Sequence, residues 1–308
     1  MKKLFIVFLG AMLLMVGCSS KKDEGGASDT PDTASTAMVY ESVKGEIKYN
    51  SDATIYADYY QGQLLYLEAN VVGLDMSWPA DSWTSVAEER GVANILGGEM
   101  EQVAALQPEL IITMNEEYYE QYAAIAPTIY IPYGSFNQED MVVEIGKILD
   151  KEKEATTWVE EFNAGIEEIK TLLDHEEYTY GLADSWGDGV YMYGANYGRG
   201  GYILYTKLGL KGTESAEAEY LRKAESYLTI DAESLINYAG DVLFVLDNDS
   251  AVPSSTEIFE SMPTWNSLTA VKNGLVYFLD DDMFMYDDPY SLNDQIEYFK
   301  EIFSNEEI

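Results

Sequence analysis

The chain offers little nucleophilic or metal-binding chemistry. Its 308 residues include one His, one Cys and 18 Lys and Arg against 55 Asp and Glu, for a formal net charge of −37. A zinc site or a Ser-His-Asp hydrolase would have to be built on His175 alone, and nucleophile-elbow, phosphate-loop and HExxH patterns are absent from the sequence. Nucleic acid is excluded as a partner, because so acidic a surface repels the phosphate backbone.

Aromatic rings are the more informative group, with 25 Tyr and 5 Trp in the chain. Many of them follow predicted strands, where α/β proteins place the loops that contact ligands. We therefore predict an apolar, aromatic-lined binding slot, although packing in the core remains the alternative for any single ring. The residues expected in the slot are Tyr60, Trp78, Trp83, Tyr118, Trp186, Tyr191, Tyr193, Tyr197, Arg199 and Tyr286.

A long amphipathic helix divides the elements that would position these rings. Apolar residues recur at three- and four-residue spacing from Glu152 to Asp174, which predicts one helix. Short predicted strands and helices alternate on both sides of this helix, which is the pattern of mainly parallel sheets covered by helices. The predicted domains are an N-terminal α/β lobe over 43–150, a bridging helix over 151–175 and a C-terminal α/β lobe over 176–308.

The N-terminus has the pattern of a targeting segment. Lys2 and Lys3 precede an apolar run over 4–15 that is too short to span a membrane. Small residues then lead to Cys18, which resembles a bacterial lipobox in which the cysteine is acylated. We expect a lipoprotein signal peptide over 1–17, lipidation at Cys18 and a flexible tether over 18–42. An ordinary secretory signal is the alternative.

The two halves share a short pattern. Glu101 lies seven residues before Pro108, which an acid and a buried strand follow, and Glu233 stands in the same relation to Gly240. The repetition indicates duplication of one α/β lobe. Chance similarity is the rival interpretation, because helix-turn-strand units look alike.

Several segments together resemble the iron–siderophore substrate-binding lipoproteins of ABC importers, within the iron/cobalamin periplasmic-binding family. The resemblance covers about 47–303, although Gln107-Pro108-Glu109 departs from the family's usual Lys-Pro-Asp. The segments are LEANVVGLD at 67–75, EQVAALQPELII at 101–112, IAPT at 125–128, RGGYILY at 199–205, LGL at 208–210, WNSLTAVKNG at 265–274 and YDDPYSL at 286–292.

The resemblance implies two Rossmann-like lobes joined by a single long α-helix, the class III architecture of periplasmic binding proteins, with the ligand between the lobes and limited closure. It implies a binding protein rather than an enzyme, without a cofactor, that acts as a monomer with an ABC permease. The expected location is the extracytoplasmic face of the cell membrane. The lipid anchor and the single Cys, which rules out an internal disulfide, suit a Gram-positive cell, and the periplasmic leaflet of an inner membrane is the alternative. Glu101 and Glu233 match the acids that dock onto permease arginines; a solvated helix acid is the alternative for each.

Charge narrows the ligand. The chain has only three Arg, and Arg90 is the only basic residue between Tyr49 and Gly146. Burying a ferric catecholate or ferric citrate would leave negative charge uncompensated, whereas a ferric tris-hydroxamate is neutral at the metal. The resemblance implies that Arg199 donates to the hydroxamate oxygens; capping of the following helix or pairing with a surface acid is the alternative.

Other ligands and functions stay open at this point. Haem would need an axial ligand, and His175 is the only histidine; cobalamin is bulky and weakly charged. A surface glycan hydrolase using paired carboxylates and a passive adhesin are the remaining candidates. The acidic run at Asp280-Asp281-Asp282, with Asp287-Asp288, lacks the spacing of a calcium loop and is interpreted as a solvated loop.

Overall fold

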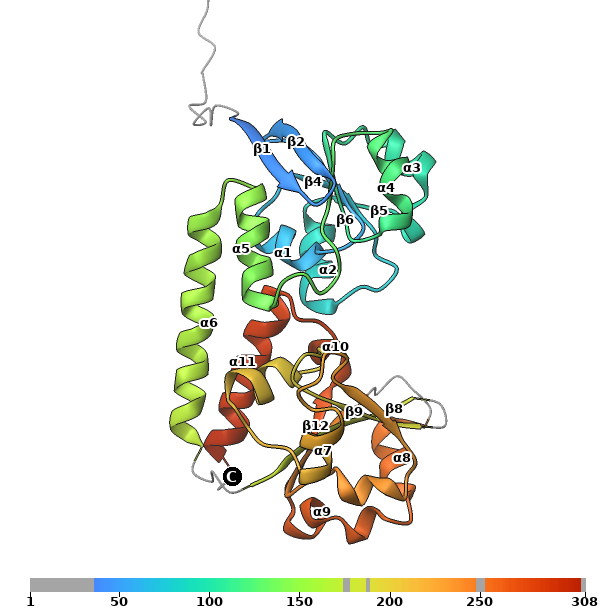
Figure 1. The fold of residues 1–308 in the computed structure, drawn as a ribbon, viewed down its shortest axis with the longest axis vertical. Helices are drawn as coiled ribbons and strands as arrows, with labels where there is room; N and C mark the ends of the chain where they lie inside the picture. The colour runs from blue at the N-terminus through green and yellow to red at the C-terminus, as the bar shows by residue number, and fades with distance from the viewer. Residues whose placement is uncertain (1–35, 174–177, 187–188, 248–252, 306–308) are drawn as a thin grey trace, which may run out of the picture. The chain divides into compact units, whose positions relative to one another are not determined.

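The computed structural model describes residues 36–173, 178–186, 189–247 and 253–305. The first lobe, coloured blue to green in Figure 1, is built on a parallel sheet of order β5-β4-β3-β6-β7. Its strands are β3 (Ile55–Ala57), β4 (Val71–Leu74), β5 (Ala93–Asn94), β6 (Leu110–Thr113) and β7 (Thr128–Tyr130). Its helices are α1 (Gln61–Tyr66), α2 (Asp81–Glu89), α3 (Met100–Ala105), α4 (Tyr119–Ala123) and α5 (Gln138–Ile148), with short 3₁₀ turns at Leu96–Gly98 and Glu116–Tyr118. The apolar run of β6 is buried along its whole length, as a central parallel strand must be.

The second lobe has a mixed sheet of order β10-β9-β8-β11-β12. β8–β9 and β9–β10 pair antiparallel, whereas β8–β11 and β11–β12 pair parallel. Three residues past the end of β8 the chain has already entered β9, too soon for the crossover that a parallel pair requires. The strands are β8 (Tyr180–Trp186), β9 (Gly189–Tyr193), β10 (Tyr227–Ile230), β11 (Val242–Asp247) and β12 (Val276–Asp280). The helices are a π-helix (Tyr202–Lys207), α7 (Glu214–Glu219), α8 (Ser255–Ser261), α9 (Thr269–Asn273) and α10 (Asp281–Phe284), with 3₁₀ turns at Ser234–Asn237 and Trp265–Ser267.

The first lobe begins earlier in the chain than the sequence predicts. Residues expected in the tether form β1 (Ala37–Ser42), which pairs antiparallel with β2 (Gly45–Asn50). The Tyr40 hydroxyl donates to Glu144 Oε1 at 2.6 Å, and the Tyr49 hydroxyl donates to the Ile148 carbonyl at 2.8 Å, so the hairpin is anchored on α5. The predicted signal peptide and Cys18 lie outside the described residues.

The predicted bridging helix is α6 (Glu152–Leu172), and the C-terminal helix α11 (Pro289–Asn305) packs against it. Trp158 Nε1 donates to Asn293 Oδ1 at 3.0 Å, and Lys300 Nζ lies 2.6 Å from Glu168 Oε2. A Cβ at Gly165 would lie 2.8 Å from Ile296 Cγ2, so this glycine allows the two helices to approach closely. Because α6 also contacts α5 and α11 also contacts α1 and α2, both helices connect the lobes.

One contact, called the acidic clasp below, is repeated in the two lobes: a carboxylate accepts hydrogen bonds from both the backbone N–H and the hydroxyl of one threonine. The Glu109 carboxylate accepts hydrogen bonds from the backbone N–H and the hydroxyl of Thr54, at 3.0 and 3.3 Å. The Asp241 carboxylate accepts the same pair from Thr179, at 2.9 and 2.7 Å. Each acid directly precedes the fourth strand of its sheet, β6 or β11. The shared geometry supports the duplication that the sequence pattern indicates.

None of the helices in the described part of the chain combines the length and the apolarity that crossing a membrane requires.

Candidate ligand-binding site

A cavity of about 1210 Å³, referred to below as the interlobe cavity, is lined by both lobes. The first lobe contributes loops that follow the carboxyl ends of its strands, at 58–63 after β3, 75–78 after β4, 114–118 after β6 and 133–138 after β7. The second lobe contributes residues 196–199 after β9 and residues 285–288 before α11. The volume suits a bulky ligand, because drug-sized sites range from about 300 to 1,000 Å³.

Seven of the ten residues predicted for the slot line this cavity. Trp83 is buried in its wall, whereas Trp78 is exposed at 73% and can cover a ligand. Four further tyrosines line the cavity without having been chosen as site residues: Tyr59, Tyr122, Tyr133 and Tyr202. The strand-end rule also selects Tyr59 and Tyr133, since they follow β3 and β7. The seven predicted residues are Tyr60, Trp78, Trp83, Tyr118, Tyr197, Arg199 and Tyr286.

The structure corrects the prediction for Tyr191 and Tyr193. Both lie within β9, paired to neighbouring strands, rather than on the loop beyond it, and neither lines the interlobe cavity. Tyr193 is buried behind Tyr197, and their rings stack with centroids 4.9 Å apart. Trp186 ends β8, and its side chain lies outside the described part of the structure.

Arg199 lines the cavity but is already paired. Its Nη1 forms an ion pair with Asp281, and the two side chains are only 14% and 4% exposed. Burial raises the pKa of Asp281, and the nearby Arg199 charge opposes that rise. The partner is thus a buried acid rather than the surface acid considered from sequence. Among the described residues Arg199 Nε and Nη2 make no hydrogen bond, so the guanidinium keeps donors for a ligand.

Two cavity residues have left-handed backbones that are unusual for their side chains. Tyr60 has a φ of 65° and Arg199 a φ of 69°. Non-glycine residues in this region carry strain of roughly 1–3 kcal/mol, which clusters at binding sites. At Tyr60 the strain is offset in part by a hydrogen bond from its hydroxyl to the Ile131 carbonyl, at 2.9 Å.

The interlobe cavity is rich in carboxylates, since Asp58, Asp75, Asp287 and Asp288 line it and Arg199 is the only cation among the described residues of the wall. Burial raises the pKa of Asp58 to about 6, although Thr113 Oγ1 and the Met114 N–H donate to it. The interpretation of 280–282 and 287–288 as a solvated loop is wrong, because Asp281 and Asp288 are buried.

The predicted docking acids lie away from the cavity. Glu101 is exposed in the first turn of α3, and Glu233 is exposed at the start of the 3₁₀ turn Ser234–Asn237. They occupy matching places, each in the short helical segment before the clasp and the fourth strand of its lobe. His175 lies outside the described residues.

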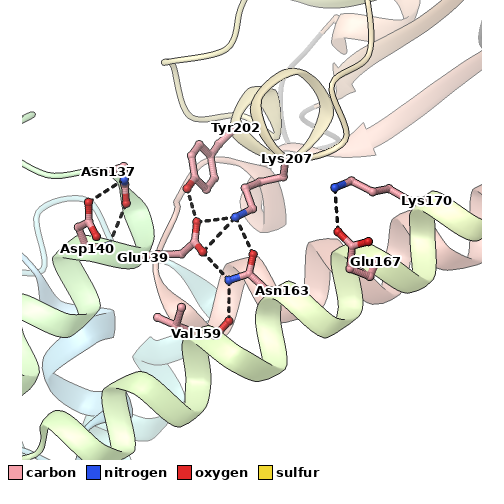
Figure 2. Close-up of polar contacts among 9 residues, drawn as sticks. All are labelled: Asn137, Glu139, Asp140, Val159, Asn163, Glu167, Lys170, Tyr202 and Lys207. Atoms are coloured by element: carbon pink, nitrogen blue, oxygen red, sulfur yellow. Dashed lines mark hydrogen bonds and ion pairs between the residues drawn. The ribbon is translucent and has the colours of Figure 1, made fainter.

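A polar cluster between α5, α6 and the π-helix connects the lobes beside the cavity (Figure 2). Lys207 Nζ lies 2.8 Å from Glu139 Oε2 and donates to Asn163 Oδ1 at 2.7 Å. Tyr202, which lines the cavity, donates to the same Glu139 carboxylate. Burial alone would raise the pKa of Glu139, but hydrogen bonds from Lys207, Tyr202 and Asn163 outweigh it and lower the pKa.

Comparison with known proteins agrees with this architecture. The family model for the periplasmic binding protein family matches residues 64–283. The chain belongs to this family. It is 32% identical to the iron(3+)-hydroxamate-binding protein YxeB of Bacillus subtilis, over 96% of this chain and 95% of the relative, and 29% identical to FhuD of the same organism, over 97% of each.

Solved structures show the same fold. FhuD from S. pseudintermedius superposes with a TM-score of 0.74 at 27% identity, over 89% of this chain and all of that one. FhuD2 from Staphylococcus aureus with bound ferrioxamine B gives a TM-score of 0.71 at 28% identity, over 82% of this chain and 98% of that one. The predicted class III architecture is confirmed, and the chain is a solute-binding protein rather than an enzyme.

Proposed function

We propose that this protein captures a ferric hydroxamate siderophore in the interlobe cavity and delivers it to an ABC permease. The observation that carries the proposal is the charge of the cavity wall, in which four carboxylates face one arginine that is already paired with Asp281. An anionic ferric citrate or catecholate placed there would be buried among like charges at a cost of several kcal/mol. A hydroxamate chelate is neutral at the metal and avoids that cost.

The relatives support the ligand class without deciding it alone. YxeB and FhuD are named for hydroxamates, and FhuD2 was solved with ferrioxamine B. Relatives at 24–28% identity are named for ferric citrate, petrobactin and ferric enterobactin. The electrostatics of the cavity therefore select among ligands that the family as a whole covers.

A titration panel tests the ligand class. Trp78 and Trp83 line the cavity, so a bound ferric chelate should quench their fluorescence. We expect submicromolar binding of ferrichrome and ferrioxamine E, and binding at least about a hundredfold weaker for ferric enterobactin, ferric citrate, haem and cobalamin. Tight capture of a catecholate, or failure of every hydroxamate, would overturn the proposal.

Arg199 is proposed to donate to the hydroxamate oxygens through Nε and Nη2. Arg199→Ala should weaken ferrichrome binding about tenfold, the equivalent of about one hydrogen bond to a charged group. That variant also leaves Asp281 as an unpaired buried acid, so the double variant Arg199→Ala/Asp281→Asn serves as the matched comparison. Unchanged affinity in the double variant would contradict the assignment.

The location and the partner complete the proposal. We propose that 1–17 is a signal peptide, that Cys18 is lipidated and that the mature protein is held at the extracytoplasmic face of the membrane. Cys18→Ser should release the protein into the medium.

Glu101 and Glu233 are proposed to dock onto the permease. Exchanging both for Lys should abolish uptake with ligand affinity intact, whereas exchanging the exposed acids Glu154 and Glu260 should not. Transport that survives the Glu101/Glu233 exchange would refute docking.

A further inference from the structure

We infer that the interlobe cavity prefers ferric hydroxamates that carry an ammonium group, and that this ammonium pairs with the carboxylate of Asp287. The inference rests on the proposed function and sharpens it. The proposed function requires only a chelate without negative charge, whereas Asp287 makes a positive charge on the periphery of the ligand favourable. Asp287 thereby becomes a specificity-determining residue.

Asp287 has a buried oxygen without a partner. Its Oδ2 accepts a hydrogen bond from Gln138 Nε2 on α5 at 2.8 Å, but Oδ1 is closed to solvent and has no hydrogen-bond partner. A Cβ at Gly198 would lie 3.3 Å from Oδ2, so the glycine leaves room beside the carboxylate. An unsatisfied carboxylate oxygen costs folding free energy, which a cationic ligand group can recover on binding.

Asp58 and Asp288 have both carboxylate oxygens hydrogen-bonded within the protein, and Asp75 has its Oδ1 bonded and no solvent-closed oxygen without a partner. Asp58 accepts from Thr113 Oγ1 and the Met114 N–H, and Asp75 accepts from the Ser77 N–H, the Ser77 hydroxyl and the Gly97 N–H. Asp288 accepts from the N–H groups of Tyr290 and Ser291 and from the Ser291 hydroxyl, at the start of α11. Among the described residues of this wall, Asp287 is thus the acid with a carboxylate oxygen that is both closed to solvent and without a hydrogen-bond partner.

No cation of the described residues pairs with Asp287. The one arginine in the wall forms its ion pair with Asp281 instead, and no ion pair between described side chains includes Asp287. A single hydrogen bond holds the carboxylate, so rotation about its Cβ–Cγ bond can present Oδ1 to a donor. An ammonium group on the ligand would supply the positive charge that Asp287 lacks within the protein, and the two would form a desolvated ion pair beside the chelate.

Tyrosine rings around Asp287 suit the same group. Burial is the main cause of the raised pKa of Tyr59, Tyr133 and Tyr202, and the negative charge of Asp287 adds to the rise in each. All three rings line the cavity, and the Tyr59 and Tyr133 centroids are 6.0 Å apart. Aromatic faces attract ammonium groups through their quadrupoles, so the rings and the carboxylate favour the same ligand charge.

The test compares two ligands that differ in one charge. Ferrioxamine B is a linear ferric trihydroxamate with a terminal ammonium, and its N-acetylated form keeps the iron centre but not the charge. Both are titrated against the full chain in detergent at pH 7.5, for the wild type, Asp287→Asn and Asp282→Asn. Asp282 is an exposed acid outside the cavity wall, five residues away, and provides the matched control.

We expect the wild type and Asp282→Asn to bind ferrioxamine B about tenfold more tightly than the acetylated form. Asp287→Asn should bind the two about equally, with affinity for the acetylated form retained. Equal binding of the two ligands by the wild type, or a preference that survives in Asp287→Asn, would overturn the inference while leaving the proposed function intact. Failure of the wild type to bind either ligand would instead overturn the proposed function. Should Asp287→Asn lose both ligands, Asp287→Ser takes its place, with the same outcomes.

Discussion

Replacing Lys207 by Met should destabilise the protein by more than any surface ion pair could account for. Lys207 and Glu139 are 18% and 14% exposed, and the ammonium contacts both Glu139 oxygens, at 3.0 and 2.8 Å, as well as Asn163. Methionine fills the same volume but leaves the Glu139 carboxylate in place without its cation. The substitution therefore tests whether the charge within the cluster, rather than packing around it, holds the lobes in register.

The expected loss in the free energy of unfolding follows from the burial of the Lys207–Glu139 ion pair. Removing one partner of a fully buried pair costs roughly 3–5 kcal/mol, and the residual exposure here reduces that to about 2–3 kcal/mol. For a protein of this size each kcal/mol lowers Tm by roughly 2–4 °C, so we expect a fall of about 4–12 °C. The lowered pKa of Glu139 means that the stabilisation is present at neutral pH and lost as pH falls through that pKa.

Thermal and urea unfolding of four variants provide the measurement. Lys170→Met on the neighbouring helix α6 is the matched control (Figure 2). Lys170 also forms an ion pair with a glutamate, Glu167, at 2.9 Å, but these two side chains are 40% and 71% exposed. We expect it to cost less than about 0.5 kcal/mol. Glu139→Gln keeps an acceptor for Tyr202 and Asn163, so Lys207→Met/Glu139→Gln should recover about 1 kcal/mol of the loss. Equal effects of Lys207→Met and Lys170→Met, or no coupling in the double variant, would refute the reasoning.

Two further predictions concern helix packing and acid titration. Gly165→Ala should lower the free energy of unfolding by about 1–2 kcal/mol in urea titrations, because the added Cβ would meet the buried Ile296. This cost should exceed the gain from alanine being the better helix former. A stabilised variant would show that α6 and α11 separate easily. Asp58, with a folded pKa of about 6 against about 3.9 when unfolded, binds its proton more tightly in the native state. Its contribution is therefore present below about pH 4 and lost as pH rises through 6. The stability of the wild type relative to Asp58→Asn should fall by roughly 2–3 kcal/mol between pH 4 and 7, and a constant difference would contradict the assigned burial.

The features that the sequence predicts well are those that depend on local pattern. The three- and four-residue apolar spacing after Glu152 predicts α6, and the repeated acid before a buried strand indicates the duplicated lobe, in which the structure shows matching hydrogen bonds at Glu109 and Asp241. The rule that ligand-binding loops follow strand ends selects seven cavity residues. It fails at Tyr191 and Tyr193 because β9 extends through both positions, and strand ends cannot be located to one or two residues from sequence.

Features that depend on distant partners could not be predicted. Asp287 belongs to an acidic run that looks solvated from sequence, and its hydrogen-bond partner Gln138 is 149 residues away in the chain. From sequence, Arg199 is expected to be free to donate hydrogen bonds to a ligand. Its ion pair with Asp281 depends on the fold, which brings the two residues together. The strand β1 was missed because its half-buried residues alternate with polar ones directly after a low-complexity segment, and its burial is decided by α5.

The pairing of α6 with α11 bears on how fast a bound chelate can leave. Separating the lobes would require bending two packed helices at once and breaking the contacts of residues 286–291 with the first lobe, including Tyr286 to the Trp78 carbonyl at 2.7 Å and Ser291 to Ser82 at 3.1 Å. We therefore expect slow spontaneous dissociation, with a residence time set by the protein and shortened only when the transporter forces the lobes apart.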